Sequence, residues 1–382
     1  MAKLGDVFNL QMGKTPSRNK SSYWNNGEYN WVSISDLSNY QKYVESTKEK
    51  ISLLAVQESG IKSVPANTVI MSFKLSLGKT AITQESIYTN EAIMAFIPTG
   101  KYDVLPDYFY YLFSAKDWSK GTNRAVMGTT LNKALLFEID VPIPPIDEQR
   151  RIAAVLDKVS DLIAKRRQQL DKLDLLIKSR FIELFGDPVS NPFGWKKQLL
   201  GTVCDVRDGT HDSPEYYETG YPLVTSKNVT SGRIDLSGCS FISESAYNQI
   251  NERSKVDFGD IIMPMIGTVG KPVIVDIEPV FAIKNVALIK FPTDAPVNNI
   301  YIRAFLESDY FDRAVTSKVR GGTQKFIALG DIRRLEILIP DSAMQDQFAA
   351  FVEQADKSKF EVQSSLEKLE ILKKSLMQRY FG

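Results

Sequence analysis

The sequence contains an internal repeat, and its two copies lie about half the chain apart. Leu4-Gly5 recurs as Leu200-Gly201, 196 positions later. Further along each copy, VIMSFKLSLGKTAI, which begins at Val69, is matched by IIMPMIGTVGKPVI, which begins at Ile261. A period this long exceeds that of a solenoid repeat. It indicates two equivalent structural units related by internal pseudo-twofold symmetry.

Each copy reads as a β-rich globular part followed by one long amphipathic helix. Short alternating or β-branched runs, such as NTVIM from Asn67, are punctuated by Gly, Asn, Asp and Pro, a pattern typical of strands and turns. A short helix is expected at residues 107–116, with its counterpart at 300–307. The sequence therefore predicts an α+β fold in four segments: β-rich domains at 1–145 and 187–341, and long helices at 146–186 and 342–382.

The two long helices carry heptad patterns that complement each other. In the first helix, apolar residues recur every seven positions at Leu156, Ile163, Leu170, Ile177 and Leu184. In the second helix they recur at Phe348, Ala355, Val362, Leu369 and Leu376. Where the first helix is interrupted by Arg166, the second has Val362. This pattern favours an intramolecular antiparallel coiled coil over two helices that each pack only on their own domain. About 36 helical residues would span about 54 Å, or about 16 base pairs of a duplex.

Length and composition place the chain in a broad class. With 382 residues it is too long for one typical core, and its apolar and charged fractions are those of an ordinary soluble protein. No run of about 18 apolar residues is present, and the start MAKLGDVFNL lacks a signal-peptide pattern, so we expect a cytoplasmic protein with no membrane partner. The net charge of +1 neither demands nor excludes nucleic acid, because a local basic face can exist in a neutral protein.

Motifs for catalysis are missing from the sequence. Cys204 and Cys239 form no CxxC pair, and His211 is the sole histidine, which argues against zinc and against His-based catalysis. The segment SLGKT, which ends at Thr80, lacks the leading glycine of a nucleotide-binding loop, and no Asp/Glu-x-Lys nuclease motif occurs. We therefore expect no catalytic, metal or cofactor site, and interpret the repeated Gly-Lys, at Lys79 and Lys271, as a strand-to-strand turn.

Three stretches carry a family resemblance that covers the full length. They are IPP (143–145) running into EQRRIA (148–153), the helix end LFGDP (184–188), and LGDV (4–7) followed by GKTP (13–16). Residues 342–347 of the second copy depart from the pattern because they lack the Pro-Pro-x-x-Glu-Gln core. With these motifs the chain resembles the specificity (S) subunit of type I restriction-modification enzymes.

The resemblance implies a function for each segment. Each globular part would be a target recognition domain that reads one half of a bipartite, asymmetric DNA site. The helices would be spacers that fix the gap between half-sites and dock two methyltransferase (M) subunits. Those subunits would methylate adenine N6 with S-adenosylmethionine, and two restriction (R) subunits would add ATP- and Mg-dependent translocation and cleavage. The S chain itself would be non-catalytic. Two alternatives remain. The chain could be an enzyme-class protein, either the detached recognition module of a single-chain restriction-modification enzyme or an active hydrolase, or it could be a coiled-coil scaffold that does not bind DNA.

Candidate DNA contacts are polar and basic residues on predicted loops, because forked or short polar side chains read base edges and Lys, Arg and backbone N–H groups contact phosphates. In the first copy they are Lys14, Thr15, Arg18, Lys20, Lys74, Lys79, Arg124, Gly128, Thr129 and Thr130. In the second copy they are His211, Asp212, Ser213, Ser226, Lys227, Asn228, Lys271, Arg320, Gly322, Thr323 and Gln324. Each could instead be a solvated loop residue or a turn former.

The two Gly-Thr loops are the strongest of these candidates. Arg124 and Arg320 occupy similar places before a small Gly-Thr turn, whose backbone can approach a duplex closely. Tyr23, Trp24 and Trp31 could stack on an extruded base, but packing in the protein core is the favoured interpretation.

Overall fold

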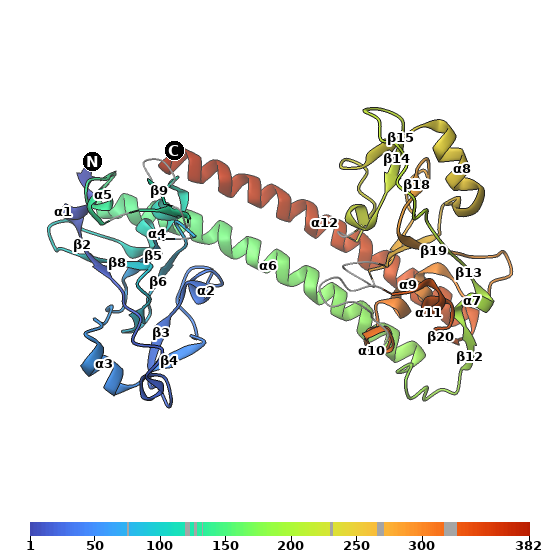
Figure 1. The fold of residues 1–382 in the computed structure, drawn as a ribbon, viewed down its shortest axis with the longest axis horizontal. Coiled ribbons are helices and arrows are strands. Elements are labelled where there is room, and N and C mark those ends of the chain that lie inside the picture. The colour runs from blue at the N-terminus through green and yellow to red at the C-terminus, as the bar shows by residue number, and fades with distance from the viewer. Residues whose placement is uncertain are drawn as a thin grey trace. The chain divides into compact units, whose positions relative to one another are not determined.

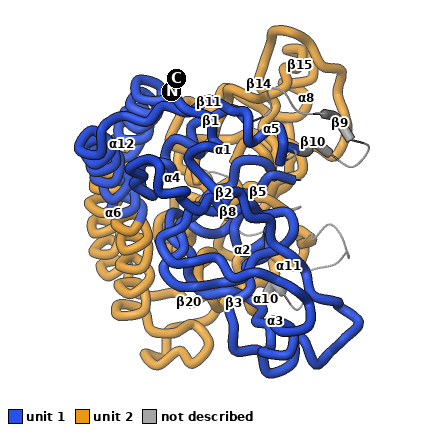
Figure 2. The backbone as a smooth tube through the Cα atoms, turned by 90° about the vertical axis from the view of Figure 1, so that its left-hand side faces the viewer, with its two compact units in different colours: residues 1–167, 364–382 blue, residues 168–363 orange. Residues whose placement is uncertain are grey.

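The computed structural model (Figure 1) describes residues 1–74, 76–118, 123–125, 128–131, 133–229, 232–265, 271–316 and 327–382. The chain divides into two compact units, coloured separately in Figure 2. Unit 1 contains Met1–Arg167 and Ser364–Gly382, and unit 2 contains Gln168–Gln363. Helices α6 (Ile146–Phe185) and α12 (Ser342–Phe381) each contribute one part to unit 1 and the other part to unit 2.

Unit 1 contains two main sheets. The first is antiparallel, with the order β2 (Phe8–Met12), β8 (Ile93–Pro98), β5 (Val69–Ser72), β6 (Thr80–Ile82). The second has the order β4 (Glu49–Ile51), β3 (Tyr29–Val32), β7 (Tyr88–Thr89), and its β3–β7 pair is parallel. The remaining strands pair as β1 (Ala2–Lys3) with β11 (Asp140–Val141) and β9 (Asn123–Ala125) with β10 (Gly128–Thr130). The shorter helices are α1 (Leu4–Val7), η1 (Ser21–Tyr23), α2 (Ile34–Leu37), α3 (Leu53–Ser59), α4 (Pro106–Ala115) and α5 (Lys133–Phe137).

Unit 2 repeats the four-stranded sheet, the three-stranded sheet and the terminal strand pair of this plan. Its four-stranded sheet is antiparallel, with the order β13 (Asp205–Asp208), β19 (Val286–Lys290), β16 (Ile261–Pro264), β17 (Val273–Ile274). Its second sheet has the order β15 (Ser240–Ile242), β14 (Tyr221–Val224), β18 (Ala282–Ile283), with β14–β18 parallel, and β12 (Lys196–Leu199) pairs with β20 (Glu336–Ile339). The shorter helices are α7 (Leu200–Val203), η2 (Ser226–Val229), α8 (Glu244–Ser254), α9 (Asn299–Leu306), α10 (Asp309–Thr316) and α11 (Leu329–Arg333). The duplication read from the sequence is therefore confirmed as a duplication of fold, and α4 and α9 confirm the two short helices.

The inner strands β5 and β16 of the four-stranded sheets are buried on both faces, which explains why their sequences, VIMS and IIMP, are almost entirely apolar. Along β5, Met71 points to a core shared with α4, α6 and α12, whereas Ile70 points to a core shared with the second sheet. Successive strand residues point to opposite faces, so a strand buried on both sides must be apolar at every position. In unit 2 the neighbours Ile261 and Ile262 of β16 divide between two cores in the same way.

Each unit takes one end of each long helix into its core. In unit 1, Leu156 of α6 belongs to the core, and the ring of Phe381 of α12 lies 5.5 Å from that of Tyr108 of α4. In unit 2, the Phe181 ring of α6 stacks at 5.6 Å on Tyr301 of α9 and meets the Phe348 ring of α12 at 5.7 Å. The start of α6 thus packs near the end of α12, and the end of α6 near the start of α12. The two helices run antiparallel, as predicted.

The predicted heptad positions are the positions that the helices bury. On α6, Leu156, Ile163, Ile177 and Leu184 are buried and Leu170 is half-buried. On α12, Phe348 and Ala355 are buried, and Val362, Leu369 and Leu376 are half-buried. The interrupting charges find polar partners: Arg166 Nε donates to Ser365 Oγ at 3.2 Å, and the Lys359 ammonium pairs with Asp174. Several apolar residues on the outer faces stay exposed: Leu175, Leu176, Ile182, Phe360, Ile371 and Leu372.

A buried glutamine fixes the start of each long helix. Gln149 Nε2 donates to Asp103 O and Pro144 O, and its Oε1 accepts from Leu105 N, all at 2.9 Å. Gln345 makes the same three bonds, to Pro296 O, Pro340 O and Asn298 N, again at 2.9 Å. The second copy lacks the Pro-Pro-x-x-Glu-Gln core but retains this glutamine 196 positions after the first. The two joints are therefore equivalent.

Candidate nucleic-acid interface

In each unit, three loops of the four-stranded sheet lie at the same edge. In unit 1, β2 ends and β8 begins there, and β5 ends where β6 begins, because Met12 pairs with Met94 and Met71 pairs with both Met94 and Thr80. We name this the loop edge of unit 1. It carries the loops that contain Lys14 and Thr15, and Lys74 and Lys79. The turn between β5 and β6 confirms the strand-to-strand interpretation of the Gly-Lys motif.

Backbone hydrogen bonds join the loops of unit 1 in series. Lys14 N donates to Thr89 O at 2.8 Å, which ties the loop after β2 to the loop before β8. Phe73 N donates to Ala92 O at 3.0 Å, and Leu131 N donates to Phe73 O at 3.0 Å. The last bond brings the end of the first Gly-Thr loop, the β9–β10 hairpin, to the same edge. Arg124, Gly128, Thr129 and Thr130 all lie in that hairpin.

The loop edge of unit 2 is built in the same way. The end of β13 and the start of β19 meet there, and Thr210 N donates to Ile283 O at 3.0 Å, which places the 209–216 loop beside the β18–β19 turn. Ile327 N donates to Met265 O at 2.9 Å, as Leu131 N does to Phe73 O in unit 1. Lys271 is exposed between β16 and β17. Arg320, Gly322, Thr323 and Gln324 lie outside the described residues.

A glycine at each loop edge allows the close approach of two backbones. A Cβ on Gly13 would lie 2.3 Å from the carbonyl oxygens of Thr89 and Asn90. A Cβ on Gly209 would lie 2.4 Å from Ile283 O. Because backbone atoms cannot yield as a flexible side chain can, only glycine fits at these two positions. The repeated glycines thus hold these loops against the sheet edge.

Arg18 is held within the protein. Its guanidinium forms two bonds with the Glu49 carboxylate, at 2.5 and 2.9 Å, and lies 3.7 Å over the Trp24 ring. The hydrogen bond to Glu49 is the main cause that raises the pKa of Arg18. Trp31 is 1% exposed, and its Nε1 donates to Lys14 O at 3.1 Å, in line with the core-packing interpretation. These contacts fix the 13–18 loop but occupy the fork that would bind a guanine.

The candidate lysines of unit 1 differ in whether their ammonium groups already contact other side chains. Lys20 donates to Tyr23 Oη at 3.2 Å and pairs with Glu58. The Lys74 ammonium lies 5.2 Å over the Phe73 ring. Lys14 and Lys79 are exposed, and neither side chain forms a hydrogen bond or ion pair with another described residue. Exposed ammonium groups that lack a carboxylate partner are suited to contact phosphates.

Asn228, another predicted DNA contact, is bonded within the protein. It is 8% exposed, its Oδ1 accepts from Thr225 N at 2.9 Å, and its Nδ2 donates to Asp235 O at 3.2 Å. Asp36 of unit 1 does the same for Ser33 N at 3.0 Å, as part of a capping box. These bonds give Asn228 a structural role in the turn. Its neighbours Ser226 and Lys227 are half-buried and exposed, respectively.

The 209–216 loop of unit 2 is anchored by polar side chains. Lys284 Nζ donates to Ser213 Oγ at 2.7 Å, and Asp212 N donates to Thr210 Oγ1 at 3.1 Å. His211 lies 2.8 Å from both Asn285 Oδ1 and Asp208 Oδ2. The sequence analysis missed Lys284 and Asn285. The alignment of KNVALIKFP with NEAIMAFIP was the available signal, because it places them beside the recognition loop.

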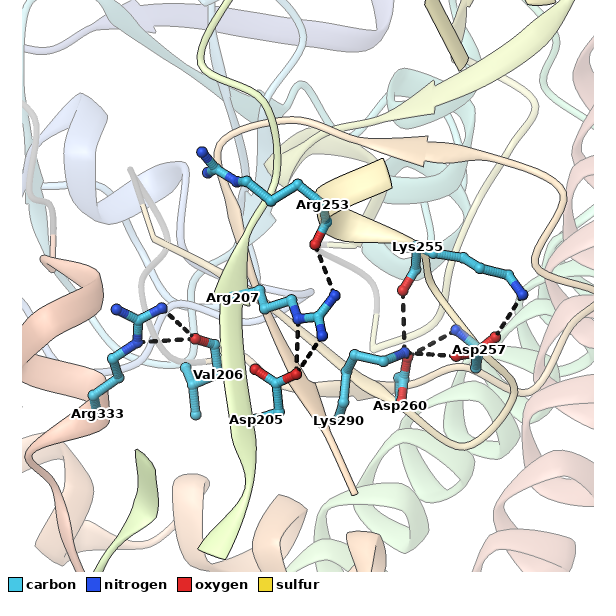
Figure 3. Close-up of polar contacts among 9 residues, drawn as sticks. All are labelled: Asp205, Val206, Arg207, Arg253, Lys255, Asp257, Asp260, Lys290 and Arg333. Carbon is cyan, nitrogen blue, oxygen red and sulfur yellow. Dashed lines mark hydrogen bonds and ion pairs between the residues drawn. The ribbon is translucent and has the colours of Figure 1, made fainter. Parts of the chain in front are cut away.

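A charged network braces the outer strand of the same sheet (Figure 3). Arg207 binds Asp205 at 2.5 and 2.8 Å and donates to Arg253 O at 2.9 Å. Arg333 donates twice to Val206 O, at 2.7 and 2.9 Å. With Asp208, Glu252 and Leu329, these side chains line an open cavity of about 600 Å³. The network connects α8 and α11 to β13, the strand that ends at the loop edge.

A half-buried lysine, Lys290, joins β19 to the loop before β16. Lys290 Nζ lies 2.7 Å from Asp257 and 2.6 Å from Asp260. Burial raises the pKa of Asp260, whereas the bond to Lys290 lowers the pKa of Asp257. Positively and negatively charged side chains lie together around the cavity and bond to one another. These side chains therefore help to hold β13 in place.

Within the described ranges, no cluster of three or more His, Cys, Asp or Glu residues could hold a metal ion. Cys204 and Cys239 are free thiols, and burial raises the pKa of Cys204 to about 12. In the same part of the chain, no helix has the length and apolar character of a membrane span.

Comparisons with known proteins match most of the length of the chain. The family described as type I restriction modification DNA specificity domain matches residues 1–174 and 192–371. The type I restriction enzyme MjaIX specificity subunit of Methanocaldococcus jannaschii is 27% identical over 381 residues, which cover 92% of this chain and 85% of that protein. The Escherichia coli EcoR124I/EcoR124II specificity subunit is 30% identical over 168 residues, which cover 42% of this chain and 40% of that one.

Two solved structures show the same fold. The S subunit of a type I restriction-modification system from M. genitalium superposes with a TM-score of 0.59 at 13% identity, covering 100% of this chain and 95% of that one. A chain from a study of complex assembly and conformational transition of the type I R-M system gives 0.60 at 17%, covering 100% and 96%.

Proposed function

The chain belongs to the type I restriction modification DNA specificity domain family, and on that premise we propose that it is the DNA-specificity subunit of a type I restriction-modification complex. Residues 1–145 and 187–341 act as target recognition domains that each read one half of a bipartite, asymmetric site. The repeated loop edge is the observation that supports this most directly. Two domains of the same plan present different side chains at equivalent loops, so they read different half-sites.

The proposed interface follows from which predicted side chains remain available. Lys14, Lys79 and Lys271 contact phosphates, since all three are exposed. Thr15, Lys74 and the β9–β10 hairpin with Arg124, Gly128, Thr129 and Thr130 complete the first domain. His211, Asp212, Ser213, Ser226 and Lys227, with Arg320, Gly322, Thr323 and Gln324, complete the second. Arg18 and Lys20 contact DNA only after release from Glu49 and Glu58, so their contribution is secondary.

The partners follow from the family and from what the long helices expose. The subunit is non-catalytic and relies on partner subunits in the cytoplasm for chemistry. Two methyltransferase subunits dock on the long helices, where Leu175, Phe360 and Ile371 are 62%, 74% and 69% exposed. Apolar groups this exposed on a helix pair are typical of protein contacts. The methyltransferase subunits bring S-adenosylmethionine, and two restriction subunits bring ATP and Mg-dependent cleavage.

Methylation-sensitive sequencing of cells that carry this chain with its methyltransferase partner tests the proposal. We expect adenine methylation within one bipartite, asymmetric motif. Combined Lys14→Ala and Lys79→Ala substitutions should weaken methylation at all sites, because phosphate contacts carry no sequence information. Lys101→Ala, an exposed lysine after β8 and away from the loop edge, is the matched control. A motif with only one half would identify a detached recognition module, and absence of DNA binding in a filter assay would identify a scaffold.

A further inference from the structure

The sole histidine of the chain lies at the loop edge of unit 2 between two hydrogen-bond acceptors. Its Nδ1 is 2.8 Å from Asn285 Oδ1, and its Nε2 is 2.8 Å from Asp208 Oδ2. A carboxylate and an amide oxygen can only accept. A neutral imidazole has one N–H, so two such contacts require a proton on both ring nitrogens.

We propose that His211 is held as an imidazolium that bridges Asp208 and Asn285, keeps the 209–216 loop in its DNA-reading position, and makes recognition by the second domain dependent on pH. The proposal deepens the proposed function and rests on it. His211 acts here as a positioning residue. Its side chain is 60% exposed, so the same charge also faces solvent at the loop edge.

The surroundings of His211 support the charged form. Asp208 ends β13 and is also paired with Arg253 of α8, so its carboxylate faces two cations. The hydrogen bonds to Asn285 and then to Asp208 raise the pKa of His211, and burial and Arg253 oppose them. Asn285 N also donates to Thr210 O at 3.2 Å, so its backbone and its side chain both hold the same loop. Lys284 fixes the loop further along, at Ser213.

Unit 1 fills the equivalent position with a group that does not titrate near neutral pH. Thr15 follows Gly13 as His211 follows Gly209, and both glycines lie against the turn before the central strand. The Thr15 hydroxyl is bonded to Glu91 and accepts from Asn90 Nδ2 at 3.2 Å. A hydroxyl thus does in the first domain what the imidazolium does in the second. The two halves of the DNA site should therefore respond differently to pH.

The direction of the effect follows from linkage. A histidine whose pKa is raised on folding stabilises the folded loop fully when the pH is below the pKa of the unfolded state, about 6.5. This stabilisation is lost as the pH rises through the pKa of the folded state. Reading of the second half-site should therefore weaken above the folded pKa. Reading of the first half-site should stay constant, because the Thr15 hydroxyl keeps its proton over this pH range.

Nuclear magnetic resonance of the full chain with ¹⁵N-labelled histidine tests the charge directly, since one residue gives all the signal. We expect a titration midpoint above about 6.5, with both ring nitrogens protonated below that midpoint. Asp208→Asn should lower the midpoint. A midpoint at or below about 6.5 would overturn the proposal whether or not the chain binds DNA.

Duplex binding by the chain with its co-purified methyltransferase partner tests the consequence. The duplexes carry the methylated motif or a change in one half-site. Between pH 6 and pH 8.5, discrimination at the second half-site should fall roughly tenfold, the effect of one lost charge-assisted hydrogen bond. His211→Thr, which copies unit 1, should show no pH dependence, and thermal unfolding shows that this variant folds. Equal discrimination at both pH values refutes the role of His211 and leaves the proposed function intact, whereas loss of all duplex binding at every pH refutes that function.

Discussion

At the scale of single residues, Gln149 and Gln345 show how a side chain can define a joint. Each satisfies two carbonyl groups and one N–H at the point where a loop turns into a long helix. Their exposed fractions are 0% and 2%. Buried backbone groups that lose their partners cost free energy, so these glutamines hold each globular domain to its helix.

Gln149→Ala and Gln345→Ala should each lower the free energy of unfolding by about 1–3 kcal/mol, because each leaves buried backbone groups unpaired. Chemical denaturation of the full chain measures the loss. Gln168→Ala, at an exposed position of α6, should have little effect. Equal stability of the two joint variants and this control would show that the joints are held by packing alone.

Lys42 marks a second polar contact between a domain and a helix. Its Nζ lies 2.6 Å from Asp107 of α4 and pairs with Asp157 of α6, and Tyr111 Oη donates to Asp157 at 2.7 Å. Burial opposes ionisation of Asp107, but the Lys42 ammonium outweighs it and lowers the pKa of Asp107 below its usual 3.8. The lowered pKa adds stability above pH about 3.8, which is lost as pH falls through the folded value.

Lys42→Met should therefore lower the unfolding free energy at pH 7 by about 1–3 kcal/mol, since two carboxylates lose a shared cation in a half-buried site. The difference between variant and parent should shrink as pH falls below 4. Urea unfolding at pH 3, 5 and 7 measures both effects. A difference that is constant over this range would mean that the packing of the lysine stem, and not its charge, accounts for the loss.

At the scale of elements, the loops of the main sheets depend on the two glycines that press them against the edge. Gly13→Ala and Gly209→Ala should each displace one recognition loop, because the new Cβ would overlap backbone oxygens. We expect methylome sequencing to show relaxed preference in the first half-site for Gly13→Ala and in the second for Gly209→Ala. Gly238→Ala meets no atom within 4 Å and is the control. Loss of preference in both halves from either variant would contradict independent reading.

The elements also show what the sequence could predict. The long helices, the short helices and the duplication are local or repetitive signals, and the structure confirms them. The strand order could not be predicted, because strands that are far apart in the sequence pair with each other. β2 pairs with β8, and β3 pairs in parallel with β7. Arg18 was taken as a free contact because Glu49, its partner, is 31 residues away. The burial of Asn228 could not be predicted, because its Thr-x-x-Asn turn signal is shared by exposed and buried turns.

At the scale of the whole molecule, the last residues of the chain belong to the core of its first domain. Leu376, Met377, Tyr380 and Phe381 pack against the aromatic core of unit 1. The Tyr108 and Phe381 rings lie 5.5 Å apart, and Arg151 lies 5.9 Å over the Tyr380 ring. Unit 1 therefore consists of the two ends of the sequence.

Leu376→Ala together with Phe381→Ala should destabilise unit 1 by about 2–5 kcal/mol, with half-burial favouring the lower end. Hydrogen exchange read by peptide should show faster exchange in β2, β5 and β8 than in β13, β16 and β19. Ile371→Ser, on the exposed face of the same helix, should leave exchange unchanged and weaken methyltransferase docking. Faster exchange confined to unit 2 would refute this assignment of the C-terminal segment.

This closing of unit 1 by its distant end sets the order of events during translation. The N-terminal domain leaves the ribosome early but waits for the final turns of α12 before its core is covered. A polypeptide that stops before Leu376–Phe381 would leave the apolar core of its first domain uncovered, and quality-control proteases recognise such open domains.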